Sequence, residues 1–131
     1  MNPLSLKKEE RLCSRKAIEK LFFEGESFFI FPLKVVYRSM ALTVPYPVQA
    51  AFSVSRRNFK RAVKRNLLKR RMREAYRLNK ADFYQTLEGK PQLAVMFIYA
   101  AREVKEYGLI EKSMKLALSK LAHLQTGKSS G

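Results

Sequence analysis

The side chains with the clearest capacity for chemistry are the basic residues between positions 56 and 73, because cations in this density bind phosphate groups. No acidic residue interrupts the stretch before Glu74. Like charges so close together repel one another, so the segment requires a polyanion or a solvent-exposed face. A merely solvated helical face usually mixes both signs, because acids and bases pair three or four residues apart. The missing acids favour a polyanionic partner, and Asn66 adds a hydrogen-bond donor and acceptor among the cations.

Catalysis by the chain itself is not predicted. Nucleases that use two metal ions cluster carboxylates around ions about 4 Å apart. Here the 11 acidic residues include one aspartate, Asp82, and lie mostly toward the two ends of the chain. Glu74 is expected to pair with a basic neighbour on its own helix. Cys13 and His123, the single cysteine and histidine, cannot form a Cys/His zinc site. We therefore expect no catalytic residue and no metal ligand.

Length and composition narrow the class of protein. The 131 residues, 47% of them hydrophobic, are enough for one domain with a packed core. The formal net charge of +16 indicates nucleic acid or an anionic membrane surface as the partner. The longest uncharged apolar run, residues 93–101, is too short to span a bilayer. The N-terminus lacks a signal-peptide core, so a cytoplasmic protein is expected. We expect a single domain over 1–131, with flexible ends at 1–13 and 125–131.

The elements that must position the basic segment are predicted from hydrophobic periodicity. They define the α+β class, as a two-layer α/β sandwich in the order helix, strands, basic helix, strand, helix. Ser14 is the expected N-cap of the first helix, Gly25 its left-handed C-terminal stop, and Asn58 the N-cap of the basic helix. The predicted ranges are 15–24, 28–40, 49–55, 60–79, 92–101 and 107–124.

A helical projection divides the basic helix into two faces. An apolar seam comprises Leu68, Met72, Ala75 and Asn79, with Tyr76 at its edge. The seam is expected to pack on the sheet. A cationic front on nearly the opposite side comprises Asn66, Lys69, Arg70, Arg73 and Arg77.

The helix also carries a recognisable motif. Residues 65–74, RNLLKRRMRE, resemble the RNxxKRxxRE signature of the bacterial ribonuclease P protein component. The preceding SVS-RR at 53–57 and the Ala62-Val63 pair resemble that family's strand and helix entry, usually SVSKK followed by AV. Weaker similarities to the family's opening helix extend the resemblance over most of 11–124; they are Arg11, Leu12, Ile18, Phe22 and Gly25.

The chain departs from the family pattern at three places. Leu67 stands where the family often has a third basic residue, and Ile18 where an aromatic residue is common. Residues 58–61, NFKR, replace a glycine-containing turn and include one extra residue.

The resemblance implies the non-catalytic protein subunit of an endoribonuclease that removes the 5′ leader from precursor tRNA. In that family the RNA subunit performs the hydrolysis with Mg²⁺, and the protein fold contains a left-handed crossover around the basic helix. The implied partners are ribonuclease P RNA and precursor tRNA. The expected RNA-subunit contacts are Arg56, Arg57, Lys60, Arg61, Lys64, Arg65, Asn66, Lys69, Arg70 and Arg73. The expected leader contacts are Ile18, Phe22, Tyr37, Ser53 and Ser55.

Two other function classes remain open from the residues alone. A basic structural protein of another ribonucleoprotein, such as the ribosome, would have a similar composition. A peripheral membrane protein is disfavoured, because the basic helix lacks the wide apolar face that lies in lipid. For Phe22 and Tyr37, the spacing alone favours core packing over nucleic-acid contact.

Overall fold

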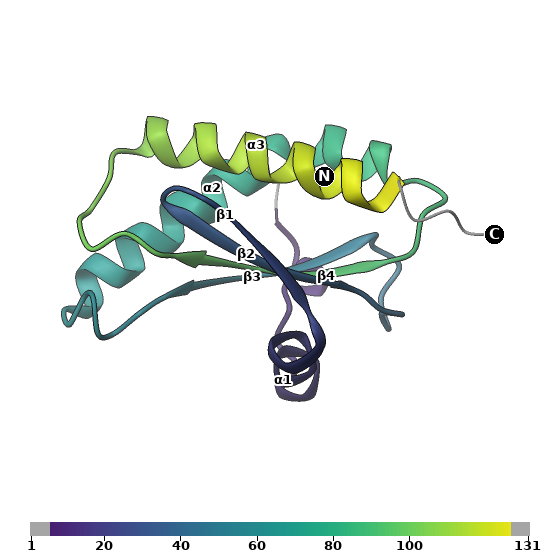
Figure 1. Cartoon of the computed structure of the whole chain (residues 1–131), viewed down its shortest axis with the longest axis horizontal. Helices are drawn as coiled ribbons and strands as arrows, with labels where there is room; N and C mark the ends of the chain where they lie inside the picture. The colour runs from purple at the N-terminus through teal and green to yellow at the C-terminus, as the bar shows by residue number, and fades with distance from the viewer. Residues whose placement is uncertain (1–5, 127–131) are drawn as a thin grey trace.

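The computed structural model describes residues 6–126 and has the predicted α+β class (Figure 1). One four-stranded sheet separates α2 and α3 on one face from α1 on the other. The expected sandwich is therefore confirmed, with α1 covering part of the second face. Along the chain the elements are η1 (Lys8–Glu10), α1 (Arg15–Glu24), β1 (Glu26–Ile30), β2 (Leu33–Ser39), β3 (Val48–Val54), α2 (Ala62–Thr86), β4 (Leu93–Tyr99) and α3 (Tyr107–Thr126).

The strands are arranged in the order β1-β2-β4-β3. Strand β4 is antiparallel to β2 and parallel to β3, and α2 connects the parallel pair. Every residue of β4 except Ile98 is buried, and β4 lies within the predicted range 92–101. Because side chains alternate along a strand, β3 directs Ala50 and Phe52 toward the α2/α3 layer and Ala51 and Ser53 toward the α1 side.

The two long helices bury the faces that the sequence predicts. On α3, a stripe of apolar side chains at helical spacing is buried throughout. On α2, the seam residues Leu68, Met72, Ala75 and Tyr76 are buried as well. Burying each large apolar side chain contributes about 1.5–3 kcal/mol. Helix α2 extends to Thr86, beyond the predicted end, and its N-cap is Arg61, which makes no side-chain capping bond. The prediction of Asn58 as the cap was wrong. The α3 stripe comprises Ile110, Met114, Ala117, Leu118 and Leu121.

The predicted strand 28–40 is in fact a hairpin. Strands β1 and β2 pair with Ile30 opposite Leu33, and the turn between them contains the cis Phe31–Pro32 peptide. Pro32 is a turn residue, but the turn has neither the glycine nor the asparagine that usually indicates a tight hairpin. The turn also reverses the alternation: Phe28 and Ile30 pack on the core, whereas Phe29 and Phe31 are exposed.

Helix α1 begins and ends at the predicted residues. The Ser14 hydroxyl accepts a hydrogen bond from the Ala17 amide at 3.3 Å, as expected of an N-cap. Gly25 stops the helix, but its φ of −77° is not left-handed, so that part of the prediction was wrong. A Cβ atom at Gly25 would lie 2.3 Å from the Leu21 carbonyl oxygen. Glycine is required here by close backbone approach.

The segment that precedes α1 makes defined contacts, although it was expected to be flexible. Arg11 forms a parallel bridge with Ala50, and the Leu12 amide donates to the Ala50 carbonyl at 2.9 Å. Near the other end, buried Gln125 accepts a hydrogen bond from Ser39 and donates one to the Pro91 carbonyl. Residues 1–5 and 127–131 of the expected flexible ends lie outside the described residues.

Candidate nucleic-acid interface

A cleft of about 430 Å³ lies on the α1 side of the sheet. Its floor includes Ala51 of β3 and Met96 of β4, and Ile18 of α1 lines one wall. Ser53 adds a hydroxyl group, and Lys69 and Arg73 line the cleft from α2. The cleft thus combines an apolar floor with cations along one side. An unpaired nucleic-acid strand needs both features, because its bases seek apolar contact and its phosphates seek positive charge.

The cationic front of α2 faces solvent, as the helical projection predicts. Asn66, Arg70 and Arg73 are exposed, and Lys69 is half-buried beside the cleft. Arg77 is held differently, because its guanidinium pairs with Glu74 of the same helix at 2.5 Å. The expected pairing of Glu74 with a basic neighbour is confirmed. The cations that remain exposed before α2 and in its first turn are Arg56, Arg57, Lys60, Arg61 and Lys64.

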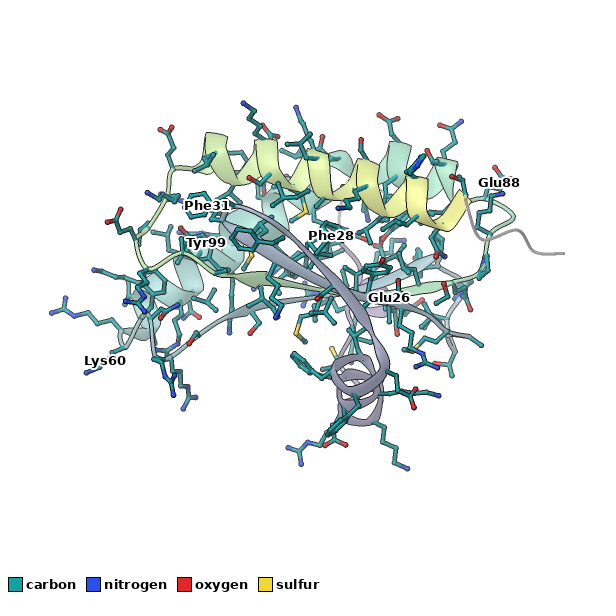
Figure 2. All side chains as sticks on the ribbon, in the orientation of Figure 1. Glu26, Phe28, Phe31, Lys60, Glu88 and Tyr99 are labelled. Atoms are coloured by element: carbon teal, nitrogen blue, oxygen red, sulfur yellow. The ribbon has the colours of Figure 1, made fainter. Side chains whose placement is uncertain are left out.

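Two sets of contacts hold the turn that leads into α2. Phe59 is 5% exposed and packs edge-on against Tyr99, with ring centroids 5.8 Å apart. The Arg65 guanidinium donates to the carbonyls of Phe59 at 2.7 Å and Lys60 at 2.8 Å. Arg65 therefore holds the turn at 58–61, and part of its hydrogen-bonding capacity is used inside the protein. Figure 2 shows the neighbouring Lys60 extending from this turn.

A second hollow, of about 440 Å³, lies at this end of the molecule. Lys60, Arg61 and Lys64 line it together with Arg102 from the loop after β4. The N-terminus of α2 adds partial positive charge from its free amides. Arg102 is absent from the sequence-based set of contacts, because nothing in its local sequence indicates that the β4–α3 loop lies beside the start of α2.

Tyr37 is not brought to the cleft. Its side chain is 5% exposed and belongs to the core on the α2/α3 side of the sheet. Its ring packs against Phe28, and its hydroxyl donates to Glu26 at 2.9 Å; Figure 2 labels these two partners. Burial, followed by the Glu26 hydrogen bond, raises the pKa of Tyr37 to about 12. The core-packing interpretation holds for this residue.

The other expected leader contacts lie on or near the α1 side. Ile18 and Ser53 line the cleft itself. Phe22 lies one helical turn beyond Ile18 and is 55% exposed. Ser55 follows the end of β3, and its hydroxyl accepts a hydrogen bond from the Arg57 amide at 3.1 Å. Ser55 therefore shapes the turn before α2.

A buried ion pair fixes the N-terminal wall of the cleft. Glu10 and Lys80 are 1% and 4% exposed, and Lys80 Nζ lies 2.6 Å from Glu10 Oε1. Tyr84 donates to the same oxygen at 2.8 Å, and the Lys7 amide donates to Oε2 at 2.8 Å. Burial tends to raise the pKa of Glu10, but the bonds from Lys80, Lys7 and Tyr84 outweigh it and the pKa is lowered. The adjoining Arg11 and Cys13 line the cleft.

Two structural findings concern metals and membranes. Between residues 6 and 126, no group of three His, Cys, Asp or Glu side chains is placed to hold a metal ion. Within the same range, no helix is long and apolar enough to cross a membrane.

The fold and the cleft together define a basic α+β protein of the RNA-binding class. The family model described as Ribonuclease P matches residues 6–122. The chain therefore belongs to the ribonuclease P protein family. This assignment favours the ribonuclease P interpretation of the basic helix over a ribosomal one.

Relatives named "Ribonuclease P protein component" support the assignment. The protein from Porphyromonas gingivalis strain W83 is 39% identical over 119 residues, covering 89% of this chain and 86% of the relative. The protein from Chlorobium phaeobacteroides is 35% identical over 130 residues, covering 91% and 86%.

Solved structures share the fold at lower identity. A Staphylococcus aureus RNase P protein, described as a mutant with defective mRNA degradation activity, has a TM-score of 0.69 at 20% identity and covers 87% of this chain and 89% of its own. The Thermotoga maritima RNase P protein, in complex with 1-(4-fluorophenyl)-2-thiourea, has a TM-score of 0.65 at 23% identity, with coverages of 84% and 98%.

Proposed function

We propose that this chain is the non-catalytic protein subunit of ribonuclease P and assists the 5′ maturation of tRNA. It binds the RNA subunit through the cationic front of α2 and the single-stranded 5′ leader of precursor tRNA in the cleft. The observation that carries the proposal is the cleft itself, which joins Ile18 and Ser53 to Lys69 and Arg73. The partners are ribonuclease P RNA and precursor tRNA, and a cytoplasmic location remains an expectation from the sequence.

The residue types of the cleft suit a leader whose sequence varies from one precursor to another. Apolar side chains accept the faces of any base, and cations follow the phosphates without reading bases. Ile18 is aliphatic, so it contributes apolar contact without ring stacking. Phe22, exposed one turn further along α1, supplies the nearest aromatic ring on that helix.

The RNA-subunit surface extends from the turn before α2 along its exposed front. Asn66 is the one member of this surface whose side chain can both donate and accept hydrogen bonds. The other members are cations suited to phosphates. Arg102 joins the cationic hollow beside Lys60 and Lys64, and we include it in the proposed surface. Arg65 fixes the turn through two hydrogen bonds from its Nη1 atom, and its other guanidinium donors are not used by these bonds.

The protein's chemical contribution is electrostatic. An RNA subunit that carries the catalytic Mg²⁺ must bring its own phosphates close to those of the substrate, which is unfavourable without counterions. A protein of net charge +16 supplies part of that neutralisation. The protein is therefore expected to matter most where Mg²⁺ is scarce.

Reconstitution with a bacterial ribonuclease P RNA tests the proposal. At low Mg²⁺ concentration, adding the protein should increase the rate of cleavage of a precursor tRNA at its mature 5′ end. The protein alone should not cleave, which serves as the control. If no protein concentration improves cleavage, the proposed function is wrong.

A further inference from the structure

Two phenylalanines at the end of the β1–β2 hairpin are exposed without a role in the core. Phe29 and Phe31 are 58% and 50% exposed, and their ring centroids lie 6.3 Å apart in an edge-to-face arrangement. Figure 2 shows Phe31 at the tip of the hairpin, near the beginning of α3. The Ser113 hydroxyl donates to the Phe31 carbonyl at 2.5 Å, which anchors this tip to α3. The ring pair is thus displayed on a fixed support.

Cations accompany the two rings. Lys105 Nζ lies 5.8 Å from the centroid of the Phe31 ring. Exposed Lys34 pairs across the hairpin with Phe29, so the two side chains lie on the same face of the sheet. We call Phe29, Phe31, Lys34 and Lys105 the hairpin platform. Its composition, aromatic faces beside cations, matches what a single-stranded nucleic acid requires.

The hairpin platform is continuous with the cleft. The strand register aligns Phe29, Lys34, Ile98 and Ser53 in one row across all four strands, on the α1 side of the sheet. The next row, which contains Val36, Met96 and Ala51, packs with α1. The outer row is more open, because Ile98 and Ser53 are half-buried and Lys34 is exposed. A path therefore leads from Ser53 in the cleft to Phe29 at the opposite edge.

We propose that the hairpin platform binds unpaired leader nucleotides that lie beyond those held in the cleft. This inference rests on the proposed function. Strand β1 lies at the opposite edge of the sheet from β3, which lines the cleft, so a leader reaches the hairpin platform only after it has passed through the cleft. It therefore receives the part of the leader that is more distant from the cleavage site. Three strand spacings of about 4.8 Å give a path of about 14 Å, or about four nucleotides at a stacked rise.

Leader length provides the test. Precursor tRNAs with leaders of about 4 and about 12 nucleotides compare a leader no longer than this path with one that extends well beyond it. Their dissociation constants are measured with reconstituted holoenzyme containing either the wild-type protein or the Phe29→Leu/Phe31→Leu variant. Leucine keeps an apolar side chain but removes the ring. Leu116→Ala, a change at a 52% exposed residue of α3, is the matched control.

The expected result is specific to the long leader. The wild-type holoenzyme should bind the long-leader substrate more tightly than the short-leader substrate. The double variant should bind the long-leader substrate at least about fivefold more weakly than the wild type, which corresponds to the loss of one stacked base. Binding of the short-leader substrate, thermal unfolding of the protein and the Leu116→Ala control should be unchanged.

Four results would overturn the inference, and the last of them would also overturn the cleft proposal. If lengthening the leader does not increase the affinity of the wild-type holoenzyme, the hairpin platform does not bind leader. The same conclusion follows if the double variant keeps the full increase in affinity. If the double variant instead abolishes self-association of the free protein, the platform is a protein interface. If no leader of any length improves binding over mature tRNA, the cleft proposal itself fails.

Discussion

Individual arginines on α2 have different tasks although they share one sequence motif. Arg65 donates to two carbonyls of the preceding turn, and Arg77 pairs with Glu74. Arg70 and Arg73 are exposed on the cationic front, and Arg73 also lines the cleft. The motif shows that the charges belong together, but only the packing of the turn and the helix shows which of them remain available for RNA.

Replacing Arg70 or Arg73 with alanine should weaken binding of the RNA subunit without lowering protein stability. Each lost phosphate contact should also reduce the slope of log affinity against log salt concentration by about 0.7–0.9. Titrations of ribonuclease P RNA at several salt concentrations measure both effects. Lys112→Ala, which removes an exposed charge from α3, is the control. An unchanged slope in both arginine variants would mean that neither side chain contacts phosphate.

Tyr37 shows where reasoning from single residues reaches its limit. The predicted continuous strand placed Phe29, Phe31, Leu33, Val35 and Tyr37 on one face. The Phe31–Pro32 turn reverses the direction of the chain between β1 and β2. Tyr37 on β2 therefore packs in the core, whereas Phe29 and Phe31 are exposed. Pro32 indicated a break in the strand, but without glycine or asparagine the sequence did not indicate a hairpin.

At the scale of elements, α2 and α3 were predictable because helical periodicity needs only local sequence. The apolar seam of α2 and the stripe of α3 are buried where the pattern places them. The order of the strands was not predictable in the same way, because β4 enters the sheet between β2 and β3 through long-range pairing. The N-terminal segment was expected to be flexible because its sequence is polar, and nothing in that sequence indicates that Glu10 pairs with Lys80 of α2.

The Glu10–Lys80 pair should make the stability of the protein depend on pH. The pKa of Glu10 is lowered in the folded state, so its stabilising contribution is complete above the ordinary glutamate pKa and is lost as pH falls through the folded-state pKa. Glu10→Gln should remove this part of the acid dependence, and Lys80→Met should cost about 3–5 kcal/mol because a carboxylate remains buried without its cation.

Denaturant unfolding across a range of acidic to neutral pH measures these effects. Glu9→Gln is the matched control, because Glu9 is the exposed neighbour of Glu10. If Glu10→Gln and Glu9→Gln show the same pH profile as the wild-type protein, the ion pair does not link the N-terminal segment to α2 energetically.

At the scale of the whole molecule, the cleft is assembled from parts that are far apart in the sequence. The N-terminal segment contributes Arg11 and Cys13, α1 contributes Ile18, and α2 contributes Lys69 and Arg73. The family resemblance led to a set of expected leader contacts, but the composition of the cleft follows only from the way the sheet brings these segments together. Lys69 and Arg73 lie where the proposed leader site and the proposed RNA-subunit surface meet, so one helix can serve both RNAs.

The position of Cys13 allows the central claim to be measured directly. Cys13 is exposed, lines the cleft and is the single cysteine of the chain. A short photo-crosslinker attached to its thiol, in active holoenzyme with bound precursor tRNA, should react with leader nucleotides. The same reagent on a Cys13→Ser/Lys112→Cys variant, where it lies on α3, should not. Crosslinks from Cys13 to the RNA subunit alone, in a holoenzyme that cleaves normally, would contradict the assignment of the cleft to the leader.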